Sequence, residues 1–151
     1  MDSTVYIDTL QGRSPPEVDA LLRRSLSHHS AVAVGELTQA FGRLDPKDPR
    51  TRGALDKLAT ALSSIPPRRL EAPSVRAFAE AGMLAGLGAR LGAADTGPAL
   101  LNDALLLLQA RETGRTLLTR NLRDFDVLQQ LVPDAQVAFY RRRDPPVGEP
   151  G

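Results

Sequence analysis

The sequence predicts an α/β protein with three layers, in which helices cover both faces of a central, mainly parallel sheet of four to five short strands. Three observations support this prediction. Short β-branched or aliphatic runs alternate along the chain with longer segments of helical periodicity. Prolines divide the sequence into short units. The length of 151 residues suits one domain, for which we expect the bounds 1–140, followed by a flexible, charged, Pro-rich tail at 141–151.

Five short runs are the candidate strands. They are rich in valine, isoleucine, leucine, threonine and aromatic residues, or lie between turn signals, which is typical of strands. Their residue ranges are 4–7, 31–34, 69–72, 116–119 and 136–140. Parallel order is expected because helical segments separate most of them.

Six longer segments have apolar residues at helical spacing, and several begin at a proline, which is favoured at the first helical position. Their predicted ranges are 15–26, 36–44, 51–65, 75–91, 99–112 and 122–131. Within the fourth segment, small residues at short spacing predict close packing inside the subunit or across a dimer; they are Gly82, Gly86, Gly88 and Gly92.

Composition excludes several kinds of chemistry. The chain has no cysteine, so disulfides, thiolate catalysis and cysteine-based metal sites are excluded. It has 19 basic and 18 acidic residues, and this balance gives no overall field of the kind that marks many nucleic-acid binders. A targeting signal and a membrane span are not expected, so we expect a cytoplasmic protein.

Four carboxylates are the candidate site. Asp8, Glu36 and Asp124 follow predicted strands, and Asp103 lies near the start of the helix that leads into the fourth strand. Ligands in open α/β sheets bind beyond the carboxyl ends of the strands, so these acids are expected to converge there. Each acid alone has an ordinary alternative as a cap, a turn residue or a solvated charge. Together they predict a Mg²⁺ or Mn²⁺ site, because clustered carboxylates repel one another and need a hard cation.

Polar side chains near the fourth strand are the candidate supports of this site. Asn121 and Asp124 are three residues apart and share a helical face, whereas Asp126 is rotated by about 200° from Asp124. Thr119 and Asn121 are expected to hydrogen-bond to an acid, a bound water or a phosphate; capping of the next helix is the alternative. Arg120 and Arg123 are weaker candidates for contacts with phosphates, with plain solvated charge as the alternative.

Other catalytic motifs do not fit. A glycine-rich phosphate loop is absent from the sequence. Leu10 occupies the position at which a haloacid-dehalogenase-type phosphatase needs its second aspartate. His28 and His29 close a predicted helix and are not expected to be catalytic.

Four short motifs resemble the PIN-domain ribonucleases, and more narrowly the VapC-type toxins of toxin–antitoxin pairs. They are Val5-Tyr6-Ile7-Asp8-Thr9, Val34-Gly35-Glu36-Leu37, Asn102-Asp103-Ala104-Leu105 and the longer stretch from Gly114 to Phe125. The last is the most specific, because a strand, Thr119-Arg120-Asn121 and Asp124-Phe125 occur at the family's spacing. The sequence departs from the pattern at Ala33 and Gly35, where relatives often carry hydroxyl or larger residues.

The resemblance implies a PIN-like fold and Mg²⁺- or Mn²⁺-dependent cleavage of RNA, often a structured RNA such as tRNA. It also implies a homodimer that a cognate antitoxin inhibits. By the same resemblance, the metal-binding acids would be Asp8, Glu36, Asp103 and Asp124, supported by Thr119 and Asn121.

The leading hypothesis is therefore a metal-dependent endoribonuclease, the toxin of such a pair. Two alternatives remain open: a non-catalytic PIN-like module that binds RNA or regulates, and a metal-dependent phosphatase acting on a small substrate. RNA binding with a clear salt dependence would distinguish an RNA enzyme from the phosphatase.

Overall fold

The computed structural model describes residues 1–143, so residues 144–151 of the predicted tail lie outside the described part. Helices and strands succeed one another as α1 (Ser3–Leu10), α2 (Pro16–Arg24), β1 (His29–Ser30), α3 (Ala31–Gly42), α4 (Pro49–Ser63), β2 (Leu70–Glu71), α5 (Val75–Arg90), α6 (Pro98–Glu112), β3 (Thr116–Thr119), α7 (Leu122–Leu131) and β4 (Gln136–Phe139). A single 3₁₀ turn, Pro67–Arg69, precedes β2. All six predicted helices are confirmed, with ends that shift by a few residues.

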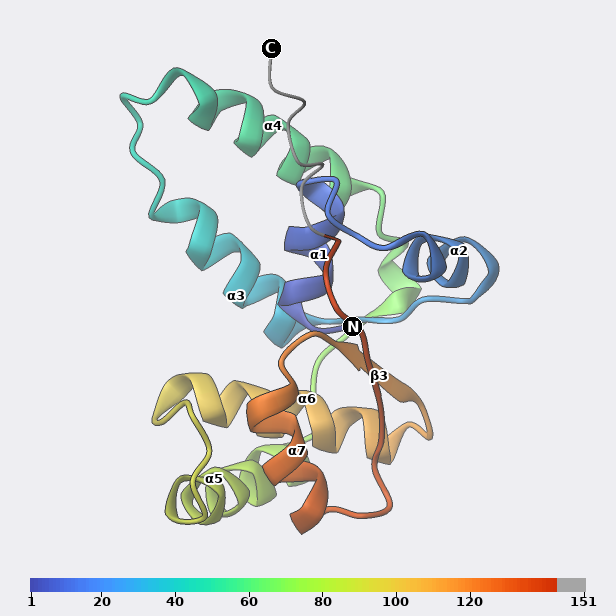
Figure 1. Ribbon diagram of the computed structural model, residues 1–151, viewed down its shortest axis with the longest axis vertical. Helices are drawn as coiled ribbons and strands as arrows, with labels where there is room; N and C mark the ends of the chain where they lie inside the picture. The colour runs from blue at the N-terminus through green and yellow to red at the C-terminus, as the bar shows by residue number, and fades with distance from the viewer. Residues whose placement is uncertain (144–151) are drawn as a thin grey trace, which may run out of the picture.

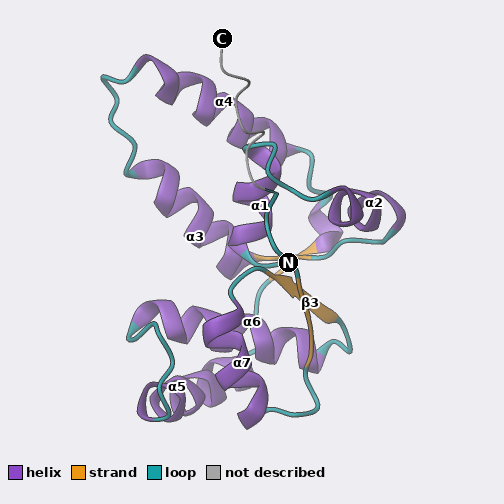
Figure 2. Ribbon diagram, in the orientation of Figure 1, coloured by secondary structure: helices purple, strands orange, loops and turns teal. Residues whose placement is uncertain are grey.

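The strands form two separate pairs. β1 pairs with β2 and β3 pairs with β4, and both pairs are parallel. Helices lie on both sides of these strands (Figure 2), which confirms the mixed α/β class. The prediction of one sheet with four to five strands is wrong for residues 1–143, which contain two sheets of two strands each.

Two predicted strands are helical instead. Residues 4–7 belong to α1, where the adjacent side chains of Val5 and Tyr6 are both buried, although a strand would bury alternate residues. Residues 31–34 open α3, because the Ser30 side chain caps this helix by accepting a hydrogen bond from the Val32 N–H at 3.2 Å. Short β-branched runs carry only a weak preference, and packing overrides it here.

Helix α6 is the centre of the hydrophobic core. It packs against α5, α7, α3 and β3, and Figure 1 shows it between these elements. Residues 103–110 are all buried, including the consecutive leucines from Leu105 to Leu108, as expected for a helix that is surrounded by protein. Phe125 and Leu128 of α7 complete the packing. The burial of α6 fixes the position of Asp103 near its start.

The glycines of α5 do not act together. A Cβ atom on Gly88 would lie 3.3 Å from the side chain of Leu128, so this glycine allows close packing of α5 on α7. Gly82 and Gly86 have no atom within 4 Å of such a Cβ. Within the subunit, the close packing predicted for the glycines of α5 is therefore seen at Gly88 and not at Gly82 or Gly86.

Among the helices of residues 1–143, none has both the length and the apolar character that crossing a membrane would require.

Candidate metal centre

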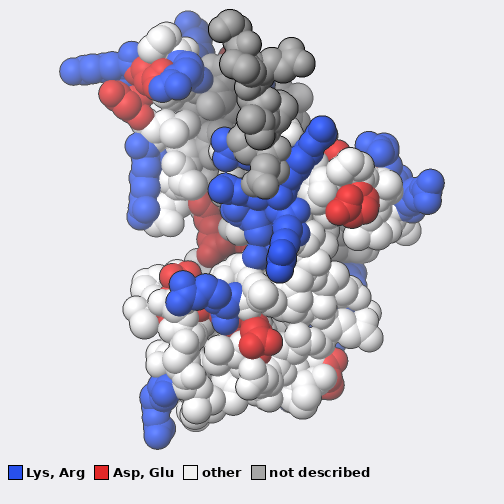
Figure 3. Space-filling model, in the orientation of Figure 1, with Lys and Arg blue, Asp and Glu red and all other residues white. Residues whose placement is uncertain are grey.

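An open pocket of about 530 Å³ lies where α1, α3, α6 and the start of α7 meet. Its lining is mostly polar and includes Asp2, Ser3, Glu36, Asp95, Asn102, Asp103 and Asn121. Figure 3 shows acidic side chains in the hollow between the part of the molecule that contains α1–α4 and the part that contains α5–α7.

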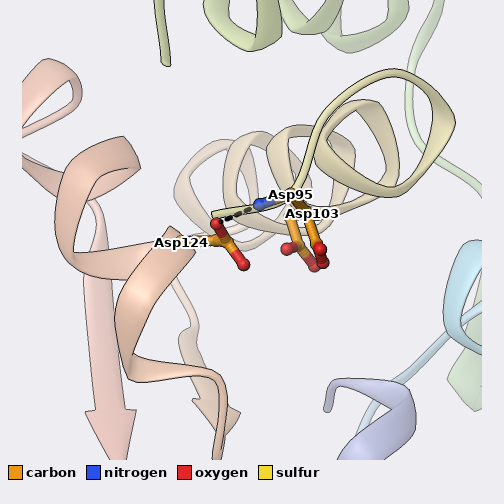
Figure 4. Close-up of side chains that lie close together, drawn as sticks. All are labelled: Asp95, Asp103 and Asp124. Atoms are coloured by element: carbon orange, nitrogen blue, oxygen red, sulfur yellow. Dashed lines mark hydrogen bonds between the residues drawn. The ribbon is translucent and has the colours of Figure 1, made fainter. Parts of the chain in front are cut away.

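Three aspartates come together beside this pocket. Asp95, Asp103 and Asp124 each offer a carboxylate oxygen, and these oxygens lie within 4.8 Å of one another. Asp103 and Asp124 are buried, whereas Asp95, in the loop before α6, is exposed. Figure 4 shows the three side chains close together, with the Asp95 backbone N–H directed at Asp124. The set contains only oxygen donors, which suits a hard divalent cation such as Mg²⁺ or Mn²⁺.

Asn121 links the two buried aspartates. Its amide nitrogen donates to Asp103 Oδ2 and to Asp124 Oδ2, each at 3.0 Å. The other oxygen of Asp124 accepts the backbone N–H groups of Ala94 at 2.7 Å and Asp95 at 3.0 Å. These contacts fix the orientation of Asp124. Asp126 is exposed and hydrogen-bonds to Gln130 on the same helix, which agrees with its predicted rotation away from Asp124.

Glu36 reaches the same pocket from α3. Ser3 donates its hydroxyl to one carboxylate oxygen at 2.9 Å, and Asn102 donates its amide to the other at 3.0 Å. Burial raises the pKa of Glu36 above its usual value, although these two hydrogen bonds oppose the effect. The structure therefore brings together Glu36, Asp103 and Asp124, three of the four predicted acids.

Asp8 does not lie in this pocket. Its side chain is buried elsewhere, where Tyr140 donates its hydroxyl to Asp8 Oδ2 at 2.8 Å and Arg120 Nε lies 3.1 Å from the same oxygen. The prediction that Asp8 converges with the other acids is not met, because it assumed that residues 4–7 form a strand that ends at the site. In the structure, α1 begins at the pocket and carries Asp8 roughly 9 Å along the helix axis away from it.

Asp2 occupies the place that was expected for Asp8. It is buried, and its Oδ2 accepts the hydroxyls of Thr4 and of the predicted support Thr119, each at 2.6 Å. Sequence reasoning missed Asp2 because residues 4–7 were predicted to form a strand, which placed the end of that strand at Asp8. The available signal was Asp2 itself, since an aspartate directly before a helix is typical of a helix start. Asp95 was missed as well, because it lies in a loop without any pattern.

The electrostatics of the pocket favour a bound cation. Burial, together with the nearby charges of Asp2, Glu36, Asp124 and Asp95, raises the pKa of Asp103 to about 9. A carboxyl group in such surroundings holds a proton at neutral pH unless a positive charge compensates the cluster. The donor set and the repulsion between carboxylates both fit a divalent ion.

The arginines predicted to contact phosphates lie outside the acidic pocket. Arg120 pairs with Asp8 and, together with Arg141 and Arg142, lines a second open pocket of about 730 Å³. Arg123 is exposed on α7. Figure 3 shows basic side chains gathered next to the hollow that contains the acidic ones. A basic surface beside an acidic pocket is an arrangement that can bind a polyanion and present it to a metal ion.

Comparison with known proteins shows a shared fold at low sequence identity. No family model matches the chain, and no curated protein matches it. Two of the solved structures that match cover almost the whole chain. The structure of FitAB bound to an IR36 DNA fragment has 16% identity and a TM-score of 0.67, covering 91% of this chain and 92% of that chain. The second, VapBC2 from Rickettsia felis bound to a promoter DNA fragment, has 17% identity and a TM-score of 0.64, covering 93% and 96%. The chain therefore has the fold of a chain in each of these two complexes.

Proposed function

We propose that this protein is a metal-dependent endoribonuclease, with the acidic pocket as its active site. The observation that carries the proposal is the convergence of Asp95, Asp103 and Asp124 within 4.8 Å of one another, with Asp2 and Glu36 in the adjoining pocket. Five carboxylates gathered around one pocket are costly to ionise without a cation. The pocket is open, so a large substrate can reach it.

The aspartates would hold a Mg²⁺ or Mn²⁺ ion. Asp103 and Asp124 provide oriented carboxylate oxygens, because Asn121 donates to both of them. When bound, such an ion lowers the pKa of a coordinated water and neutralises the charge that develops on a phosphodiester. Asp2, held by Thr4 and Thr119, adds negative charge beside Asp103 and strengthens the attraction for the ion.

Glu36 has a separate role in the proposed reaction. Its two oxygens are positioned by Ser3 and Asn102, and burial raises its pKa above the usual value. A carboxyl group that is fixed in place and has a raised pKa is suited to transfer a proton to or from a reacting oxygen. The chain offers no cysteine nucleophile, and hydrolysis by an activated water does not require one.

RNA and an antitoxin are the proposed partners. Arg120, Arg141 and Arg142 line one pocket, and the Arg120 backbone contacts Thr4 of the acidic pocket, which supports a polyanionic substrate. The shared fold with FitAB and VapBC2 supports a role as the toxin of a toxin–antitoxin pair. We extend the proposal to a homodimer that acts on RNA in the cytoplasm, through the domain expected at residues 1–140, as the resemblance to VapC-type toxins implies.

The test is cleavage of total RNA with Mg²⁺ or Mn²⁺, with and without EDTA. We expect cleavage that EDTA abolishes, and that Asp103→Asn lowers by about 100-fold or more, since even supporting residues of metal sites contribute 10- to 100-fold. The matched control is Asp126→Asn, which removes an exposed carboxylate from α7 and should retain full activity.

Other outcomes would reject the proposal in different ways. Cleavage that persists in EDTA and in Asp103→Asn would reject the assigned site. RNA binding with a salt dependence but without cleavage would favour the non-catalytic module. Hydrolysis of a generic phosphomonoester without RNA cleavage would favour the phosphatase.

A further inference from the structure

The two small sheets are separated by a groove of about 480 Å³. One wall contains His28 and the two residues of strand β1, His29 and Ser30. The other wall contains Thr116, Leu117 and Leu118 of β3. Figure 2 shows the strands in the middle of the molecule, beside the N-terminus. The groove shares no lining residue with the acidic pocket, so it is a second feature of the described chain, distinct from the proposed active site.

The backbone on both walls is available for strand pairing. The Asp2 N–H donates to the Leu118 carbonyl at 3.1 Å, whereas the Tyr140 N–H, next to β4, donates to the Thr119 carbonyl at 3.2 Å. Successive residues of a strand direct their backbone groups to opposite edges, so Thr116 faces the groove as Leu118 does. On the other wall, the His28 carbonyl accepts the amino group of Met1 at 3.4 Å. Met1 and Asp2 therefore already contact both walls at one end of the groove.

Apolar side chains cover both faces of the groove. Leu21 and Leu22 of α2 and the following Leu26 lie on one side, and Leu106 and Ala110 of α6 lie in the same lining. Leu21 on α2 is 46% exposed, and Leu26, in the chain that follows this helix, is 73% exposed. A strand that is covered by helices on both faces carries apolar side chains in both directions, and this lining fits such a strand.

We propose that the groove binds an extended, apolar segment that is joined by a peptide bond to Met1. Paired with β1 on one side and β3 on the other, this segment would unite the two pairs into one five-stranded sheet. The facing part of β3, from Thr116 to Leu118, has the length of about three residues, or about 10 Å. The direction of the segment is fixed, because it must lead into Met1 and continue the hydrogen bond from Asp2 to Leu118.

The environment of the Met1 amino group supports this occupant over a separate peptide. The group is buried, and burial lowers its pKa. A peptide N–H in the same position would keep the contact with the His28 carbonyl without carrying a charge. A free peptide in the groove would instead have to end against this buried amino group.

The test is the full chain with a four-residue extension, Val-Ile-Val-Leu, placed directly before Met1 and after a new initiator methionine. The control carries Ser-Gly-Pro-Gly at the same place, which lacks apolar side chains and one backbone donor. We expect the apolar extension to raise the Tm by about 5 °C and to slow amide exchange at Thr116 and Leu118 by about tenfold, while the control leaves both near the original values. Equal effects of the two extensions would overturn the proposal.

A second variant checks that the extension occupies the groove. Leu21→Asp is tolerable for folding because this side chain is partly exposed, and it should remove most of the gain in Tm. Leu55→Asp, on α4 and outside the groove, has similar exposure and should leave the gain intact. If a free Val-Ile-Val-Leu peptide slows amide exchange at Thr116 and Leu118 to the same extent as the fused extension, the proposed covalent connection to Met1 is overturned. Metal-dependent cleavage is measured separately, so failure of the proposed nuclease function leaves this test unaffected.

Discussion

Asp8→Asn is the substitution that best separates the two groups of buried carboxylates. Asp8 lies outside the acidic pocket and connects three segments: α1, the turn after β3 through Arg120, and the chain after β4 through Tyr140. Asparagine keeps the size of the side chain and one acceptor oxygen, but it removes the charge. The variant therefore tests whether Asp8 supports the fold or the proposed reaction.

The expected magnitude follows from the two contacts. A hydrogen bond to a charged group contributes about 1.5–3 kcal/mol, and Tyr140 retains a neutral acceptor in the variant. Arg120 is 30% exposed, so solvent screens part of its interaction with Asp8. We expect the free energy of unfolding to fall by about 2 kcal/mol, which lowers the Tm of a chain of this length by about 4–8 °C. Tyr140→Phe removes only one hydrogen bond and should cost about 1 kcal/mol.

The assays are urea unfolding, thermal melting with and without Mg²⁺, and RNA cleavage at a temperature where all variants are folded. Asp8→Asn should be less stable but should keep its Mg²⁺-induced rise in Tm and its cleavage rate. Asp126→Asn, an exposed change on α7, should alter stability by no more than about 0.5 kcal/mol. If Asp8→Asn unfolds like the wild type and loses the response to Mg²⁺, Asp8 belongs to the metal centre and our assignment of Asp2 is refuted.

Three further predictions concern pH, metal and helix α5. Because the pKa of Asp103 is raised to about 9, the folded chain keeps a proton on this carboxyl group that the unfolded chain has released above about pH 4. Without metal, the free energy of unfolding measured by urea titration should therefore decrease from pH 5 to pH 9. Asp103→Asn should flatten this trend. Millimolar Mg²⁺ at pH 8 should raise the Tm of the wild type, because the ion binds the folded state, and an equal rise in Asp2→Asn would exclude Asp2 from the site. Gly82→Ala and Gly86→Ala should each stabilise the chain by about 0.5–1 kcal/mol, since a Cβ meets open space at both positions. Gly88→Ala should give no such gain, because its Cβ would lie 3.3 Å from a leucine side chain; equal unfolding free energies for all three variants would contradict the packing argument.

Much of the candidate site could be predicted from local patterns. Helix α7 extends over the predicted residues, because its start is marked by Asn121 and its apolar face recurs at helical spacing. Asn121 and Asp124, three residues apart, share one face for the same reason. Asp103 was placed correctly near the start of α6, since Pro98 marks where that helix begins.

The first acid of the pocket could not be placed in the same way. The run of four β-branched and aromatic residues from Thr4 to Ile7 is compatible with a strand and with a buried helix, and periodicity cannot separate them over so short a length. Because a strand was predicted for this run, the first acid of the site was expected at Asp8 and not at Asp2. Asp95 has no local signal at all, because a loop residue joins a site only through the positions of the elements around it.

The longer helices, the strands β3 and β4, and the polar face that joins Asn121 to Asp124 were predictable from the sequence, because helical periodicity and short β-branched or aliphatic runs are signals carried by neighbouring residues. The tertiary structure alone decided that the strands form two separate pairs, that Asp2 and Asp95 lie beside Asp103, and that Asp8 pairs with Arg120. Those outcomes depend on packing between distant segments, whose free energy exceeds the weak conformational preference of any four-residue run.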